Sequence, residues 1–267
     1  MRALRAMNTG LDTGRVNMAI DEALLRGVEG GSSPQTVRVF GWRPPAVSIG
    51  HSQDAGRELD MEACRRLGFD VVRRPTGGRA VLHSGELTYS VVGRSGDDGL
   101  GRTVMETYRR IADALVRGLR SMGVDAGLEE TASVTRPRGA VATPPCFASA
   151  GRYEIVVSGR KLVGSAQRRL GSAVLQHGSL LVDPSHAEIV EVLRVPEGSR
   201  ERMRGRLLKR TTDLASLLGS APDFEDIASA IFRGFELEWG VELIHKGPTA
   251  VESESALRLA TEYAVVG

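Results

Sequence analysis

The chain has 267 residues, of which 41% are hydrophobic and 25% are charged, and its formal net charge at pH 7 is +2. This length allows one large domain or two small ones, and the composition is that of a folded protein, not a disordered one. The sequence has no apolar run of the roughly 18 residues that span a membrane, no apolar segment typical of a secretory signal, and too few cysteines for a disulfide scaffold or a four-cysteine zinc site. We therefore expect a soluble, cytoplasmic protein.

Strand patterns dominate the first hundred residues, with helices inserted between them. Apolar residues Ile20, Leu24 and Val28 recur four apart, which predicts a helix over 16–29. The same periodicity predicts further helices at about 57–67 and at 102–122. Short runs rich in β-branched and aromatic residues predict strands at 36–42, 46–50, 69–73, 80–82 and 87–93.

The rest of the chain changes from strands to helices. Residues 133–146 contain three prolines and little periodicity, so we expect a loop there. Because strands and helices do not alternate regularly, the pattern favours one α+β domain over a doubly wound dinucleotide fold. The predicted strands are at 153–158, 161–166 and 173–182, and the predicted helices are at about 185–193, 211–218, 223–238 and 252–263.

Paired glycines follow a predicted strand in the segment Arg73–His83. Glycines permit close backbone approach, and their N–H groups can point at an anion or at a carbonyl oxygen. The flanking arginines add positive charge. The segment matches neither the G-x-x-x-x-G-K-[ST] phosphate loop nor the G-x-G-x-x-G fingerprint. Taken alone, the segment is compatible with an ordinary turn and with a site that binds an anion or a carbonyl oxygen.

A lysine stands out in this chain, because only three of the 35 basic residues are lysines. Lys161 lies between Gly159 and Gly164 in a run otherwise typical of a strand. Its position beside an arginine indicates that a compact ammonium is needed there and not a guanidinium, although a solvated strand-edge residue is the alternative. The small net charge argues against general nucleic-acid binding, whereas a local arginine patch could steer an acidic protein partner.

The two cysteines have different sequence environments. Cys146 follows two prolines at the end of the predicted loop, and such loops often carry catalytic groups. Cys64 lies in a helical pattern, so we interpret it as a small packing residue. No His-x-x-x-His pattern links the five histidines, which disfavours a zinc enzyme.

These segments, together and in this order, resemble the lipoate–protein ligase and octanoyltransferase superfamily. The resemblance covers most of residues 15–185, and biotin ligases share the fold but have a Gly-Arg-Gly-Arg segment that is missing here. It implies a single biotin/lipoate protein ligase-like catalytic domain over 1–267. The α+β core, a mixed β-sheet flanked by helices, would occupy 30–245, and a short helical C-terminal extension 246–267. The residues that carry the resemblance are Asn17-Met-Ala-Ile-Asp-Glu-Ala-Leu24, Arg73–His83, Glu86–Val91, Tyr153-Glu154, Gly159–Gln167 and Leu175–Leu181.

Two details are similar to the LipM-type octanoyltransferases and differ from ATP-dependent lipoate ligases. The ligases usually have three glycines after the Arg-Arg pair, whereas this chain has Gly77-Gly78-Arg79. Many ligases also carry a further C-terminal domain, for which the residues after 185 leave too little room. In the LipM-type group, the cysteine that corresponds to Cys146 carries the acyl group. The lysine fifteen positions later, here Lys161, assists it.

The resemblance thus implies transfer of an octanoyl group from octanoyl-acyl carrier protein to a lysine of a lipoyl-domain protein such as the glycine-cleavage H protein. It implies no cofactor or metal, and neither nucleic acid nor a membrane as a partner. Candidates for the walls of an eight-carbon slot are Val71, Val81, Leu82 and Val163. The implied substrate-binding residues are Arg73, Thr76, Gly77, Gly78, Arg79, Ala80, His83, Gly164, Ser165, Ala166 and His177.

The chemistry agrees with this assignment, because a thioester donor is already activated and needs no ATP. A free cysteine thiol has a pKa near ~8.5, and a nearby ammonium increases its thiolate fraction. Lys161 would supply that ammonium and would stabilise the oxyanion of each tetrahedral intermediate. Two alternatives stay open: an ATP-dependent lipoate ligase using ATP and Mg, in which Lys161 contacts an acyl-adenylate, and a non-catalytic acyl-binding member of the fold.

Overall fold

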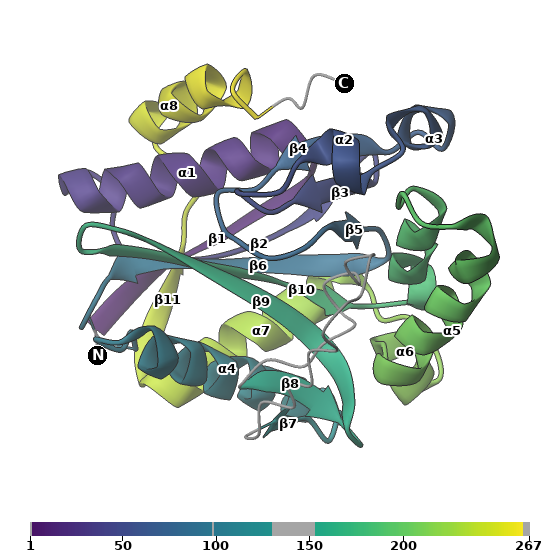
Figure 1. The fold of residues 1–267 in the computed structure, drawn as a ribbon. Helices are drawn as coiled ribbons and strands as arrows, with labels where there is room; N and C mark the ends of the chain where they lie inside the picture. Colours follow the sequence, from purple (N-terminus) through teal and green to yellow (C-terminus); the bar gives the residue numbers. More distant parts are fainter. Residues whose placement is uncertain (1, 98, 130–152, 264–267) are drawn as a thin grey trace.

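The computed structural model describes residues 2–97, 99–129 and 153–263, and its centre is an eight-stranded sheet (Figure 1). The strand order is β11-β1-β2-β6-β10-β9-β8-β7. β1 pairs in parallel with β2 and β11, and all other neighbours are antiparallel, so the predicted mixed sheet is confirmed. The strand bounds are β1 Arg2–Asp12, β2 Thr36–Trp42, β6 Glu86–Arg94, β7 Gly127–Glu129, β8 Glu154–Val157, β9 Arg160–Leu170, β10 Ala173–Leu181 and β11 Val241–His245.

A smaller sheet has the order β4-β3-β5, with β3 parallel to β4 and antiparallel to β5. Two short helices connect β3 to β4, and the apolar side chains of this unit share a second core with η2 and α5. The bounds are β3 Ala46–Ile49, α2 Ala55–Glu58, α3 Met61–Arg66, β4 Asp70–Arg73, β5 Val81–His83, η2 Pro184–Glu191, η3 Glu197–Ser199, α5 Arg200–Arg210 and α6 Leu214–Leu218.

Helices cover both faces of the large sheet (Figure 1). α1 (Gly14–Gly30) and α8 (Ala250–Ala260) lie on one face, and α4 (Val104–Ser121) and α7 (Phe224–Trp239) lie on the other. The main core fills the space between the sheet and α4 and α7. Gly118 and Gly234 let these two helices approach closely, because a Cβ on Gly234 would lie 2.6 Å from the Gly118 nitrogen.

Most predicted elements are present, and the differences have local causes. The helix predicted at 57–67 is two helices, because the Asp60 carboxylate caps a new helix at Met61. The strand predicted at 161–166 continues to Leu170, and 185–193 is largely a 3-10 helix. β1, β7, α5 and β11 were not predicted, and the tail is therefore not wholly helical. The loop predicted at 133–146 lies outside the described residues.

Within the described parts of the chain, no helix combines the length and the apolar character that crossing a membrane requires.

Candidate active site

A narrow cavity of about 40 Å³ opens between the large and the small sheet. Its lining is mainly apolar or backbone, with a few polar side chains held in place by hydrogen bonds. Five of the predicted substrate-binding residues line it: His83, Gly164, Ser165, Ala166 and His177. The other lining residues are Met18, Trp42, Ser48, Arg74, Val81, Thr88, Gly178 and Ser179.

The turn between β4 and β5 forms one side of the cavity. Buried Arg74 donates hydrogen bonds to the carbonyl oxygens of Ser48, Gly77 and Arg79. Gly78 has φ +102°, and its carbonyl oxygen lies so close to Gly50 that a Cβ there would be 2.1 Å away. The turn is therefore rigidly attached to the end of β3.

Several predicted substrate-binding residues hold this turn and do not line the cavity. Arg73 donates to the carbonyl oxygens of Gly50, His51 and Gln53. Ala80 belongs to the second core, and the Thr76 hydroxyl contacts a histidine. The remaining residues, Gly77, Gly78 and Arg79, are outside the described lining. The guanidinium of Arg73 thus binds backbone in this structure.

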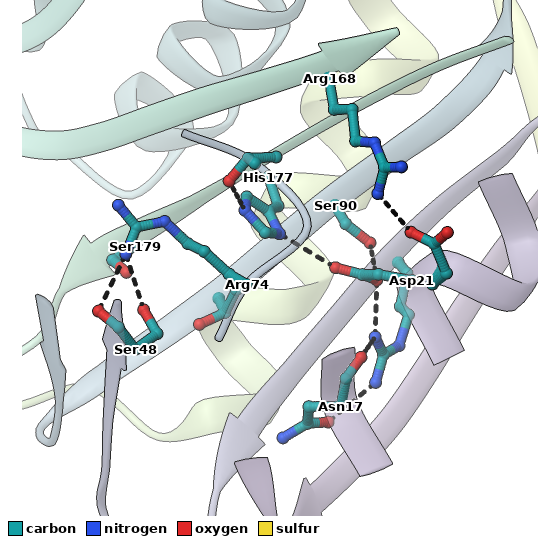
Figure 2. Close-up of polar contacts among 12 residues, drawn as sticks. Asn17, Asp21, Ser48, Arg74, Ser90, Arg168, His177 and Ser179 are labelled. Carbon is teal, nitrogen blue, oxygen red and sulfur yellow. Dashed lines mark hydrogen bonds and ion pairs between the residues drawn. The ribbon is translucent and has the colours of Figure 1, made fainter. Parts of the chain in front are cut away.

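His177 connects the turn to α1 through both of its ring nitrogens. Its ring faces the Asp21 carboxylate (Figure 2), with Nδ1 3.1 Å from a carboxylate oxygen, and its Nε2 lies 2.7 Å from the Thr76 hydroxyl. Burial lowers the pKa of His177, so the ring is neutral. Since an ionised carboxylate can only accept, Nδ1 donates to Asp21 and Nε2 accepts from Thr76. His177 therefore presents its ring, not a free nitrogen, to the cavity.

Asp21 is fully buried and is held ionised by a buried arginine. Burial opposes ionisation, but the Arg38 guanidinium at 2.7 Å, with His177 and Ser90, lowers the pKa of Asp21 overall. Arg38 also donates to the side chain and the carbonyl oxygen of Asn17. A buried ion pair is stable only when its remaining donors and acceptors are satisfied, and this network satisfies them.

His83 is fixed in a similar way on the other side of the cavity. Its Nε2 lies 2.7 Å from the Ser48 hydroxyl, and its Nδ1 lies 2.8 Å from the Glu86 carboxylate. Trp42 stacks on its ring and donates from Nε1 to Thr88, which in turn donates to Glu86. Both cavity histidines thus have partners at both ring nitrogens. In this structure they line the cavity without offering an unoccupied ring nitrogen to it.

Lys161 lies at the start of β9, in the same strand as the lining residues Gly164 to Ala166. The side chain is buried and forms an ion pair with Glu154 of β8. Gly164 is three positions further along β9, which at about 3.3 Å per residue is roughly 10 Å along the strand. The alternative of a solvated edge lysine is therefore wrong. Lys161 is not among the described residues that line the cavity.

The two cysteines are described unequally. Cys64 is buried in the second core, and burial raises the pKa of its thiol to about 11, which confirms the packing interpretation. Cys146 lies outside the described residues. The chain on either side of its segment is anchored, because the Tyr153 nitrogen donates to the Glu129 carbonyl oxygen at 2.9 Å. Tyr153 directly precedes Glu154, the partner of Lys161.

Some contributors to the site were not predicted from the sequence. Of the four aliphatic slot candidates, only Val81 lines the cavity, while Val71, Leu82 and Val163 pack in the cores. Trp42, Met18 and Ser48 were not identified from the sequence, because the patterns of their strands and helix are those of ordinary buried elements. Asp21 had a usable signal: it lies four residues after Asn17, so both polar side chains share one face of the helix. In the described part of the chain, no group of three potential metal ligands is present.

The comparisons with known proteins agree with this architecture. The family model described as the lipoyl protein ligase A/B catalytic domain matches residues 13–236. Octanoyltransferase LipM of Kyrpidia tusciae is 42% identical over 265 residues, covering 98% of this chain and 97% of the relative. Octanoyltransferase LipM of Geobacillus kaustophilus is 39% identical, with 94% and 91% covered.

Solved structures show the same fold. Lipoate-protein ligase A bound with ATP superposes with a TM-score of 0.76 at 26% identity, covering 98% of this chain and 95% of the other. The bipartite lipoate protein ligase of Thermoplasma acidophilum has a TM-score of 0.79 at 24% identity, with 98% and 93% covered. The second likeness shows the fold alone.

Proposed function

The chain belongs to the LipM octanoyltransferases of the lipoyl protein ligase A/B catalytic domain family, and from this premise we propose its reaction. It transfers an octanoyl group from octanoyl-acyl carrier protein to a specific lysine of a lipoyl-domain protein, the glycine-cleavage H protein being the acceptor we expect. The observation that carries the proposal is the identity of about 40% to octanoyltransferases over nearly the whole chain.

The proposed reaction has two steps that share one nucleophile. The Cys146 thiolate attacks the thioester carbonyl carbon, a new S–C bond forms, and the S–C bond to the carrier breaks. The carrier leaves as a thiolate, which takes up the proton that the Cys146 thiol released on ionisation. The neutral amine of the acceptor lysine then attacks the Cys146 thioester, an amide forms, and the cysteine thiol is restored. No ATP is needed, because the energy of the donor thioester is retained in the acyl-enzyme.

The cavity supports the binding of an alkyl chain. Its lining includes Trp42, Met18, Val81 and the β9 residues Gly164 to Ala166, and the polar atoms of Trp42, Ser48 and His83 have hydrogen-bond partners. A chain bound there gains the free energy of apolar burial, about 0.8 kcal/mol per methylene group, without removing hydrogen bonds from the wall.

Lys161 is proposed as the cation that assists both steps. An ammonium near the thiol stabilises the thiolate and the oxyanions that form from it. Its ion pair with Glu154 holds the buried side chain at the start of β9, the strand that carries the lining residues Gly164 to Ala166. The neutral His177 and the occupied nitrogens of His83 leave these two histidines without a free base, which favours the lysine for this role.

The test is the intact-protein mass after incubation with octanoyl-acyl carrier protein in the absence of ATP. We expect one added octanoyl group on the wild type and on Cys64→Ala, and none on Cys146→Ala. Octanoyl transfer to the acceptor at an ordinary rate by Cys146→Ala would disprove the covalent route. Modification that requires free octanoate and ATP would instead identify a ligase, and no product with either donor would identify an acyl-binding protein.

A further inference from the structure

Helix α5 carries a stripe of exposed cations. Six of its eleven residues are basic and one is acidic. Arg202, Arg206, Lys209 and Arg210 are spaced at i, i+4, i+7 and i+8, which places them on one face of the helix. All four are exposed, whereas Met203 and Leu207 are buried against the second core.

Three cations of the stripe lack the ion pairs that arginines of other helices form in the described structure. Within the described residues, no ion pair or side-chain contact with an acid is present at Arg202, Arg206 or Lys209. By contrast, Arg26 of α1 pairs with Glu22, and Arg258 of α8 pairs with Glu254. Like charges four residues apart disfavour a helix, so the spacing of Arg202 and Arg206 opposes the helix that it occupies. An anionic partner would remove this repulsion.

The stripe lies next to the start of β9, where Lys161 is located. α5 ends at Arg210, and the next residues run beside β9: Thr211 forms a bridge with Lys161, and the Thr212 nitrogen donates to the Lys161 carbonyl oxygen at 2.9 Å. Figure 1 shows α5 at the outside of the fold, where a macromolecule can approach it. A partner bound to α5 would thus lie next to the strand that carries Lys161.

We propose that the exposed basic face of α5, formed by Arg202, Arg206 and Lys209, is the docking surface for the acidic carrier protein that delivers the octanoyl thioester. The proposal rests on the proposed function, of which it specifies the donor. Acyl carrier proteins are acidic, and their thioester arm is attached through a phosphodiester. Guanidinium groups match both carboxylates and phosphates by paired hydrogen bonds. The lipoyl-domain acceptor presents a lysine and no phosphodiester, which favours the donor as the occupant.

The experiment compares two donors that differ only in the carrier. Octanoyl-acyl carrier protein and octanoyl-pantetheine are used in turn with wild type, the double variant Arg202→Glu/Arg206→Glu and the single variant Lys209→Glu. The control is Arg109→Glu/Arg117→Glu on α4, which changes the net charge equally at exposed arginines elsewhere. Binding of fluorescent octanoyl-acyl carrier protein is measured by anisotropy with the same proteins.

At low salt, we expect the α5 double variant to lose about tenfold or more in kcat/KM for the carrier-bound donor, since charge complementarity raises association rates by this order or more. Its kcat/KM for octanoyl-pantetheine and its KM for the acceptor should stay unchanged, and carrier binding should weaken in parallel. The α4 control should change little. Raising the salt concentration should reduce the difference between wild type and the α5 variant.

Equal losses with both donors, a change confined to the KM of the acceptor, or unchanged carrier binding would each overturn the proposal. Failure of the proposed function is a separate result: no octanoyl transfer by the wild type from either donor. In that case the anisotropy measurement still decides whether α5 binds the carrier protein.

Discussion

Trp42 lies face to face with His83, with ring centroids 3.9 Å apart and ring planes inclined by 13°. The indole is fixed further by the hydrogen bond from its Nε1 to Thr88 at 2.7 Å. Trp42 is on β2, and the lining residues Gly164 to Ala166 are on β9. In the strand order β2-β6-β10-β9, the axes of β2 and β9 are three inter-strand spacings apart, or roughly 14 Å. An extended octanoyl chain has seven carbon–carbon bonds and spans roughly 9 Å.

This relationship predicts that Trp42 limits acyl chain length. Because Lys161 is on β9, the carbonyl end of the acyl group should lie at β9 and its methyl end at Trp42. Trp42→Leu should raise the ratio of kcat/KM for decanoyl over octanoyl donors by about tenfold or more, as expected when a pocket gains room for methylene groups. Trp239→Leu on α7 is the control. An unchanged ratio in Trp42→Leu would place the methyl end elsewhere.

Lys161 and Glu154 should set the reactivity of Cys146 in opposite directions. On a Cys64→Ala background, Lys161→Ala should shift the midpoint of iodoacetamide labelling to higher pH. It should also slow acyl-enzyme formation, tenfold for each ~1.4 kcal/mol of lost transition-state stabilisation. Lys161→Arg should restore labelling better than turnover, because it keeps the charge and changes its shape. Glu154→Gln removes the negative charge that faces Lys161 and should shift the labelling midpoint to lower pH. Superimposable curves would remove Lys161 from thiol activation.

Thr76 should control the protonation of His177. Thr76→Val keeps the shape of the side chain but leaves His177 Nε2 without its donor, which costs about 1–3 kcal/mol at a buried site. The freed nitrogen can then bind a proton, so octanoyl transfer should fall at mildly acidic pH more steeply than in the wild type. Thr76→Ser should restore the wild-type pH profile. Identical pH profiles for all three proteins would contradict this role.

Glu252 should stabilise α8 in a pH-dependent way. Burial opposes its ionisation, but hydrogen bonds donated by Arg5, the Ser33 hydroxyl and the Thr249 backbone nitrogen lower the pKa of Glu252 to about 2 from an ordinary value of 4.5. A depressed pKa stabilises the folded state above the ordinary value, and this stabilisation is lost as the pH falls from 4.5 toward 2. Glu252→Gln should therefore lower the free energy of unfolding by about 3 kcal/mol at pH 7, because Arg5 stays buried without its partner.

Urea unfolding at pH 7 and pH 3 checks this expectation. The difference between wild type and Glu252→Gln should shrink at pH 3. Glu254→Gln on the same helix breaks an exposed pair with Arg258 and should cost less than about 0.5 kcal/mol at either pH. A difference of the same size at both pH values would show that the carboxylate charge of Glu252 contributes nothing.

The amino-acid sequence by itself determined the elements whose patterns are local. The helix α4 was predicted within two residues at its start from its regular apolar stripe, and the structure shows that a capping box of Thr103 and Glu106 begins it there. The strand predicted at 173–182 covers all of β10 and extends one residue beyond it. The two motifs around Gly77 and Lys161 were also recognisable. Paired glycines indicate unusual backbone geometry, and a lysine is a rare residue type in this chain, so each signal lies within a single short segment.

Only the tertiary structure decided how distant segments meet. β1 pairs with β11, more than 200 residues away, and neither strand has an alternating pattern strong enough to reveal itself alone. The partners of the charged groups were likewise hidden: Arg73 and Arg74 bind backbone carbonyls, while Asp21 binds Arg38 and His177. Burial makes such pairs obligatory, but which pairs form depends on sheet order and register, which no local pattern encodes.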